Sequence, residues 1–186
     1  MIIYEEILRE FQKQKVKYVL VGGIAVNLLG SFRTTADLDI LVEMNDKNLT
    51  KVITILKKRG YQVKQPVDPM GIADEKTRKD WIHKKHMKAF NFYKYDEFKE
   101  VDIIIDSPVS YKQASKNAIK IKSGKITLPV ISINDLIKMK KNTGRGVDQS
   151  DIQALKHIQE LRKQKWSLPP ALQERNYTHL NFYALL

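Results

Sequence analysis

The chain of 186 residues contains no cysteine, which excludes disulfides, zinc–thiolate sites and cysteine nucleophiles. It also lacks any apolar run near the ~20 residues that a membrane span needs, so no membrane partner is expected. The first ten residues, MIIYEEILRE, carry acidic residues early and have no small-residue cleavage site. This pattern is typical of an amphipathic helix rather than a signal peptide. We expect a cytoplasmic protein with one domain, or with one domain and a small helical appendage.

Acidic residues are scarce relative to basic ones: 21 Asp and Glu stand against 33 Lys and Arg, a net charge of +12. Such an excess favours polyanionic partners, which include nucleotides, RNA and DNA. A solvated, lysine-rich surface explains the same charge equally well. Charge governs solubility and steering, so it cannot identify a reaction by itself.

Apolar periodicity predicts the secondary structure. Spacings of three and four residues predict helices over 2–15, 24–30, 46–59, 108–116, 132–141 and 148–163, with Asp46 and Ser132 as N-terminal caps. Short apolar or alternating runs predict strands over 18–21, 37–42, 61–63, 87–94, 99–105, 119–121 and 126–130. Residues 64–80 hold two prolines, a glycine and many charges, so we expect a loop there with at most a helical turn.

These elements predict an α/β (α+β) fold, with a mixed, mainly antiparallel sheet flanked by helices and a helical C-terminal portion. We place the core in residues 1–130. Residues 131–186 are expected to supply C-terminal helices and a tail packed on that core. The end of the tail is rich in apolar residues and is expected to dock on this chain or on a second copy.

The first candidate for chemistry is the pair Gly22-Gly23, which ends a short apolar strand and precedes a predicted helix. Glycine lets the main chain approach a phosphate closely. The N-terminus of the following helix would direct its positive end at that phosphate. The pattern therefore indicates a phosphate-binding turn.

The second candidate is the pair Asp37 and Asp39, which lie two residues apart on a predicted strand and so point to the same face. Carboxylate oxygens are the ligands that magnesium prefers. A third carboxylate from another strand would complete a two-metal site. Asp102, inside the apolar run from 101 to 105, is the first choice for it, and Asp106 is the second. The alternative is that Asp102 caps a turn or pairs with a lysine.

Residues 19–43, VLVGGIAVNLLGSFRTTADLDILVE, resemble the signature of the DNA polymerase β-like nucleotidyltransferases. The resemblance is closest to a minimal bacterial branch that includes the AbiEii-type abortive-infection toxins, whose pattern is similar to GG-x-A…G…R-x-T-x-D-[IL]-D. The matching positions are Gly22, Gly23, Ala25, Gly30, Arg33, Thr35, Asp37 and Asp39. More loosely, the resemblance extends to residues 101–105 and 131–140, with Arg145, Asp148 and Asp151 behind them.

The resemblance implies a magnesium-dependent enzyme that binds a nucleoside triphosphate such as ATP. Gly22 and Gly23 resemble its phosphate-binding turn, and Asp37 and Asp39 resemble its metal ligands. Asp102 resembles the third carboxylate, which would both ligate metal and activate the acceptor hydroxyl. Lys140 resembles a lysine that contacts the triphosphate. Gly23 departs from the pattern, because many relatives have serine there.

Two basic residues have alternative roles. Lys140 falls on the apolar stripe of the predicted helix 132–141, and a lysine there needs an anion, either a carboxylate or a phosphate. The alternative is that its stem reaches the domain edge. Arg33 either contacts the nucleotide or holds the loop by pairing with a carboxylate such as Asp37. Asp148 and Asp151 are expected to cap the last helix.

A basic cluster spans residues 76–88, with an aromatic residue among the charges. Such a composition suits single-stranded nucleic acid, on which aromatic rings stack. Its candidate contacts are Lys79, Trp81, Lys84 and Lys85. The alternative is a hairpin edge that lysines protect from strand pairing. His83 and His86 are expected to be a surface pair rather than metal ligands.

The sequence predicts transfer of a nucleoside monophosphate but leaves the acceptor open. An RNA end, such as a tRNA end modified by a toxin-like enzyme, fits the net charge. A small molecule of the antibiotic type and a protein side chain are the alternatives. A catalytically silent member that binds nucleic acid or a partner is a further one. An antitoxin or a second copy of the chain is the expected protein partner.

Overall fold

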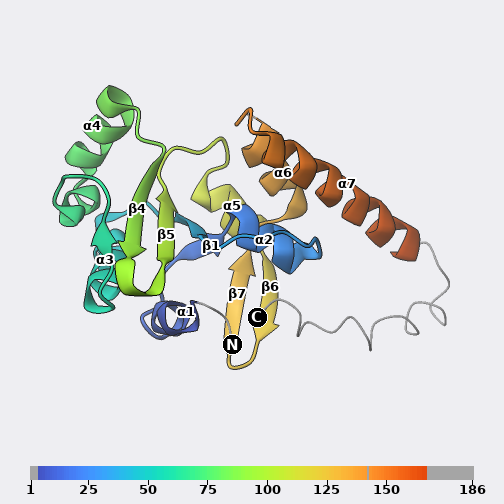
Figure 1. Ribbon diagram of the computed structural model, residues 1–186, viewed down its shortest axis with the longest axis horizontal. Coiled ribbons are helices and arrows are strands. Elements are labelled where there is room, and N and C mark those ends of the chain that lie inside the picture. Colours follow the sequence, from blue (N-terminus) through green and yellow to red (C-terminus); the bar gives the residue numbers. More distant parts are fainter. Residues whose placement is uncertain (1–3, 142, 167–186) are drawn as a thin grey trace.

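Seven strands pair into one mixed sheet in the computed structural model of the chain, which describes residues 4–141 and 143–166 (Figure 1). The strands are β1 (Tyr18–Leu20), β2 (Leu38–Val42), β3 (Gln62–Val63), β4 (Ala89–Lys94), β5 (Lys99–Ile104), β6 (Ile119–Ser123) and β7 (Ile126–Val130). Their order is β3-β4-β5-β2-β1-β7-β6. The β2–β5 and β1–β7 pairs are parallel and the others are antiparallel. The predicted mixed, mainly antiparallel sheet is confirmed.

Helices surround this sheet. They are α1 (Glu5–Lys13), α2 (Gly22–Leu29), α3 (Asp46–Lys58), α4 (Glu75–Lys85), α5 (Tyr111–Asn117), α6 (Ile133–Lys141) and α7 (Gly146–Trp166), with short 3-10 turns η1 (Pro69–Ala73) and η2 (Tyr95–Glu97). In Figure 1, α3 lies to the left of β4 and β5, and α6 and α7 lie side by side at the right. None of the helices described is both long and apolar enough to cross a membrane.

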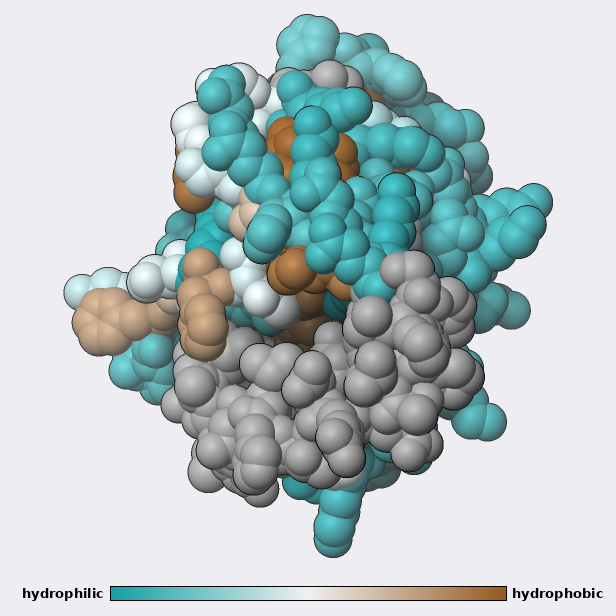
Figure 2. All heavy atoms as spheres, turned by 90° about the vertical axis from the view of Figure 1, so that its right-hand side faces the viewer, coloured by the Kyte–Doolittle hydropathy of each residue, from teal (hydrophilic) through white to brown (hydrophobic). Residues whose placement is uncertain are grey.

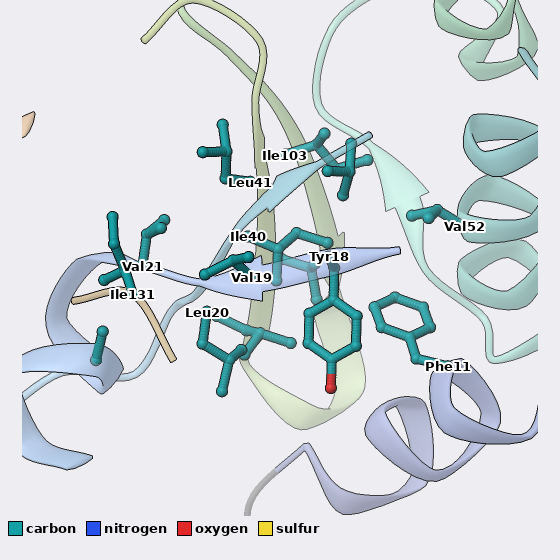
Figure 3. Close-up of a cluster of buried hydrophobic side chains, with 14 of the residues drawn as sticks. Phe11, Tyr18, Val19, Leu20, Val21, Ile40, Leu41, Val52, Ile103 and Ile131 are labelled. Atoms are coloured by element: carbon teal, nitrogen blue, oxygen red, sulfur yellow. The ribbon is translucent and has the colours of Figure 1, made fainter. Parts of the chain in front are cut away.

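The main core lies on one face of the sheet. Leu38, Ile40 and Val42 alternate along β2, and all three are buried. Tyr18 pairs with Val42 across the strands, and Phe11 of α1 packs edge-on against the Tyr18 ring, with 5.2 Å between centroids (Figure 3). Because successive side chains of a strand point to opposite faces, the residues between these apolar positions face the other side. Along β4 and β5 that other side is half-exposed.

The expected loop over 64–80 is wrong from Glu75 onward. Residues 69–73 form η1, which is the helical turn that the prediction allowed. A full helix, α4, then begins at Glu75, capped by the Asp74 carboxylate, which accepts a hydrogen bond from the Thr77 N–H at 2.8 Å. The inward face of α4 is made by Trp81, stacked on Phe90 at 5.4 Å, and by Arg78, which donates to backbone carbonyls. A helix held by so few side chains carries no apolar stripe that periodicity could detect.

Several predicted boundaries also move. α2 begins at Gly22 rather than at residue 24, and β4 begins at Ala89 because α4 and its left-handed C-cap His86 occupy the preceding residues. Asn45, not Asp46, caps α3 by accepting from the Asn48 N–H. α7 is longer at both ends than predicted. The expected apolar tail after residue 166 lies outside the described residues.

Replacing Trp81 with alanine should lower the free energy of unfolding by about 3–5 kcal/mol, because the change removes a buried ring and leaves a cavity against Phe90. Urea denaturation measures this. Tyr95→Ala is the matched control, because its ring is 82% exposed and its loss should cost under about 0.5 kcal/mol. Equal unfolding midpoints for the two variants would contradict the packing of α4.

Candidate active site

A row of three polar side chains crosses the open face of the sheet. Parallel pairing of β2 with β5 places Asp39 directly opposite Asp102, and antiparallel pairing of β4 with β5 places Asn91 opposite Asp102 on its other side. Directly opposed residues point to the same face, with Cβ atoms about 5 Å apart. The fold therefore brings together two carboxylates that are far apart in the sequence.

The Gly22-Gly23 turn packs directly onto Asp39. Gly22 has a left-handed φ of +63°, and a Cβ on it would overlap the Asp39 carboxylate. The Gly23 N–H donates a hydrogen bond to that carboxylate, so the N-terminus of α2 faces an anion. A Cβ on Gly23 would lie 2.5 Å from the Thr35 Oγ1. The serine found in many relatives has no room here, because Thr35 fills that space.

Asp102 is oriented by an amide on the neighbouring strand. The Gln65 Nε2 donates to the Asn91 Oδ1 at 2.7 Å, and the Gln65 Oε1 accepts from the Asn91 backbone N–H at 3.3 Å. With its carbonyl engaged, Asn91 turns its NH₂ group toward the Asp102 carboxylate and bonds to it. The Oδ1 of Asp102 is buried and has no hydrogen-bond partner. Asn91 therefore holds the carboxylate, while the hydrogen-bonding capacity of the buried Oδ1 is unfilled.

Both carboxylates are more basic than ordinary ones. Burial, followed by the charges of Asp102 and Asp37, raises the pKa of Asp39 to about 6, although the Gly23 N–H and Lys140 act against the rise. Burial also raises the pKa of Asp102, an effect that Asp37 and Glu100 reinforce while the Asn91 bond opposes it. A cation between the two side chains would relieve this repulsion.

Asp37 is the outermost of the three aspartates. It lies just before β2 and is exposed, yet its charge acts on both Asp39 and Asp102. Within residues 4–141 and 143–166, no three acidic or histidine side chains are already arranged to hold a metal ion. Magnesium commonly uses one or two carboxylates and completes its shell with waters and substrate phosphates. The orphaned oxygen of Asp102 and the raised pKa of Asp39 fit that mode of binding.

Lys140 was expected to pair with a carboxylate or a phosphate, and in the structure it pairs with two carboxylates. It is only 6% exposed, and its Nζ lies 2.7 Å from Asp148 and 2.7 Å from Asp151 of α7. Asp151 also pairs with the Arg33 guanidinium at 2.6 Å. Arg33 therefore holds its loop through a carboxylate, as one of its two predicted roles required, and the carboxylate is Asp151 rather than Asp37.

Asp148 is ionised where it pairs with Lys140. Burial acts to raise its pKa, but hydrogen bonds from Lys140, Thr143 and Arg145 lower the pKa to about 2. Asp148 lies in the first turn of α7 and Asp151 in the second. Their carboxylates bind side chains of Lys140, Thr143, Arg145 and Arg33, and their role as caps stays a prediction.

Hydrophilic side chains cover most of the described surface on the side of the molecule where α7 lies (Figure 2).

The basic cluster lies on α4, so both interpretations of it need correction. Trp81 is buried against Phe90 and cannot stack on a base, and the cluster is not a hairpin edge because α4 is a helix. Lys79 and Lys84 are exposed but pair with Glu75 and Asp80 one turn earlier. Lys85 lies 5.9 Å from the Trp81 ring centroid.

Sequence inspection missed Asn91, Gln65 and the packing of Thr35. The signal for Asn91 is present, since a polar residue between Phe90 and Phe92 must face the open side of the sheet. Nothing local indicates that the open side of β4 borders Asp102. That proximity depends on the strand pairing.

The chain is similar to known proteins in sequence and in fold. The family model described as "Nucleotidyltransferase of unknown function (DUF6036)" matches residues 1–166. No curated protein matches. The lincomycin-bound lincosamide antibiotic adenylyltransferase LnuA is 21% identical with a TM-score of 0.56, over 84% of this chain and 96% of that one. ANT(2'')-Ia in complex with adenylyl-2''-tobramycin is 14% identical with a TM-score of 0.51, and the match covers 87% of this chain and 94% of that one. These likenesses show the fold.

Gly22→Ala should destabilise the protein more than Gly124→Ala does. Both glycines have positive φ, but a Cβ on Gly124 meets nothing within 4 Å, so its cost is only the backbone strain of about 1–2 kcal/mol. At Gly22 the overlap with Asp39 adds about 1–3 kcal/mol. Urea denaturation at pH 7 compares them, and equal costs would refute the close packing of the turn on Asp39.

Asp39 should make the metal-free protein less stable as the pH rises. Its pKa is about 6 in the folded protein and 3.8 ordinarily, so the folded state holds the proton more tightly than the unfolded chain. The resulting stability is present below about pH 4 and is lost as the pH rises through 6. The stability of the wild type minus that of Asp39→Asn should fall by about 2 kcal/mol between pH 4 and pH 7 in EDTA. A pH-independent difference would show that Asp39 titrates normally.

Proposed function

We propose, for a chain that belongs to the nucleotidyltransferase family DUF6036, that Asp39 and Asp102 form the centre of nucleotidyl transfer. A nucleoside monophosphate would pass there from a nucleoside triphosphate to an acceptor hydroxyl. The observation that carries the proposal is the cross-strand placement of these two carboxylates beside the Gly22 turn. Two like charges in a buried row destabilise the fold by repelling each other. A reaction that uses a bound cation explains why the protein has them.

Each part of the site has a role in this proposal. The N-terminus of α2 at Gly22-Gly23 binds the triphosphate through backbone N–H groups. Lys140 and Arg33 add positive charge, and their pairing with Asp151 fixes both in place. Asp39 and Asp102, with Asp37 at the rim, would hold magnesium, which when bound neutralises phosphate charge.

The transfer itself forms one bond and breaks one. The acceptor oxygen attacks the α-phosphorus, and the bond from that phosphorus to the bridging oxygen of pyrophosphate breaks. The Asp102 carboxylate takes the proton of the acceptor hydroxyl. Its raised pKa makes it a better base than an ordinary carboxylate. The hydrogen bond from Asn91 holds that carboxylate in place.

RNA is the first candidate acceptor, in a role like that of a toxin or an abortive-infection enzyme. The net charge of +12 supports it. The exposed Lys79 and Lys84, with Lys85, offer phosphate contacts on α4. Trp81 of α4 stacks on Phe90, and Phe90 faces away from Asp102 because it neighbours Asn91 on β4. The lysines of α4 therefore lie on the opposite side of the sheet from Asp102. They would contact a polyanion that extends from the site around the edge of the sheet.

A small hydroxyl compound is the second candidate acceptor. LnuA, a lincosamide antibiotic adenylyltransferase, shares this fold over nearly its full length. The sheet face beside Asp102 is open along β4 and β5 and carries Tyr93 and Glu100, both only partly buried. Such a face can accept a compact polar molecule without help from α4.

Asp39→Asn and Asp102→Asn should each reduce transfer of label from an α-labelled triphosphate with magnesium by about 100-fold or more, because each removes charge that acts in the transition state. Asp106→Asn is the matched control. It changes an exposed aspartate that follows β5 and should stay within about twofold of the wild type. Full activity of either site variant would refute the proposed centre.

The acceptor is identified in the same assay by supplying total RNA and a small-molecule extract in turn, with each of the four triphosphates. Label in RNA supports the first candidate, and label in a small molecule replaces it with the second. Label that appears only on protein would contradict both. Loss of RNA labelling in a variant with Lys79, Lys84 and Lys85 changed to glutamine would place RNA on α4.

A further inference from the structure

Tyr4 is a buried residue outside every motif that the sequence indicates. It is the N-cap of α1 and is only 2% exposed. Its hydroxyl donates a hydrogen bond to the carbonyl of Ala36 and accepts one from the backbone N–H of Glu100 at 3.1 Å. Ala36 immediately precedes Asp37, and Glu100 lies two residues before Asp102. One hydroxyl therefore contacts the two backbone segments that carry the carboxylates.

The position of this hydroxyl relative to the sheet explains why it is there. The parallel pairing of β2 with β5 begins at Leu38 and Val101. Two residues before Leu38 and one before Val101, the Ala36 carbonyl and the Glu100 N–H are joined through the Tyr4 oxygen. The Tyr4 hydroxyl satisfies both backbone groups and sets the separation of the strands where they enter the site.

The hydroxyl remains a donor at all physiological pH values. Burial is the largest cause that raises the pKa of Tyr4, and Asp37, Glu100 and Asp102 raise it further, to about 12. The ring reaches this place from the main core, because Tyr4 packs with the buried residues around α1.

We propose that Tyr4 is a positioning residue for the carboxylate centre: its hydroxyl fixes the strand starts of β2 and β5 so that Asp39 and Asp102 can share a divalent cation. Tyr4 does not touch the nucleotide. Its effect passes through the backbone at Ala36 and Glu100. This inference rests on the proposed function, because it assumes that these two aspartates share a cation.

Tyr4→Phe tests the proposal, because it keeps the ring and removes only the bridge. Tyr18→Phe is the matched control, a second buried tyrosine of the same core, which pairs with Val42 at the end of β2 remote from Asp37. The probe is Mn²⁺, and its binding is measured by electron paramagnetic resonance in the presence of a non-hydrolysable ATP analogue. Amide hydrogen exchange at Glu100 and thermal unfolding are measured on the same samples.

Tyr4→Phe should weaken Mn²⁺ binding about five- to tenfold, the effect expected from losing about one hydrogen bond of positioning. It should also speed exchange at Glu100, while Tyr18→Phe stays within about twofold of the wild type in both. If Asp39→Asn abolishes Mn²⁺ binding but Tyr4→Phe binds as the wild type does, the inference about Tyr4 is overturned and the site stands. If Asp39→Asn binds Mn²⁺ normally, the proposed function itself fails. Equal weakening in both tyrosine variants would assign the effect to general stability and overturn the inference.

Discussion

The parallel pairing of β2 with β5 is the constraint on which the site depends. It fixes Asp39 opposite Asp102, and no side-chain rearrangement can separate two residues held by a strand ladder. Burial and neighbouring acidic charges raise the pKa of both carboxyls, so the folded chain is destabilised whenever both are ionised. A protein keeps such an arrangement where a cation or a reaction compensates for it.

The surrounding groups act on that pair without removing its charge. Gly22 and Gly23 let the start of α2 approach Asp39. Asn91 bonds to the Asp102 carboxylate, whose buried Oδ1 has no hydrogen-bond partner. Lys140 is close enough to lower the pKa of Asp39, yet its ammonium is bound by Asp148 and Asp151. Because Asp151 also pairs with Arg33, the C-terminal helices are tied to the loop that leads into β2. The site is therefore assembled from both ends of the described chain.

The local parts of this site were predictable from the sequence, and their assembly was not. The alternation around Asp37 and Asp39 and the apolar run around Asp102 predict strands, and each lies in or beside one. The Gly-Gly turn is equally visible. Which strand pairs with which is a long-range property, so the contacts of Asn91 and Tyr4 with the site could not be seen. α4 was missed for a different reason, because Trp81 and Arg78 hold it without an apolar stripe.

A crystal structure of the protein with Mn²⁺ and a non-hydrolysable triphosphate, with anomalous scattering recorded for manganese, tests the central claim most directly. The account predicts an anomalous peak within coordination distance of both Asp39 and Asp102, with the phosphates at the Gly22-Gly23 turn. Manganese bound elsewhere, or a triphosphate whose phosphates lie away from that turn, would contradict it.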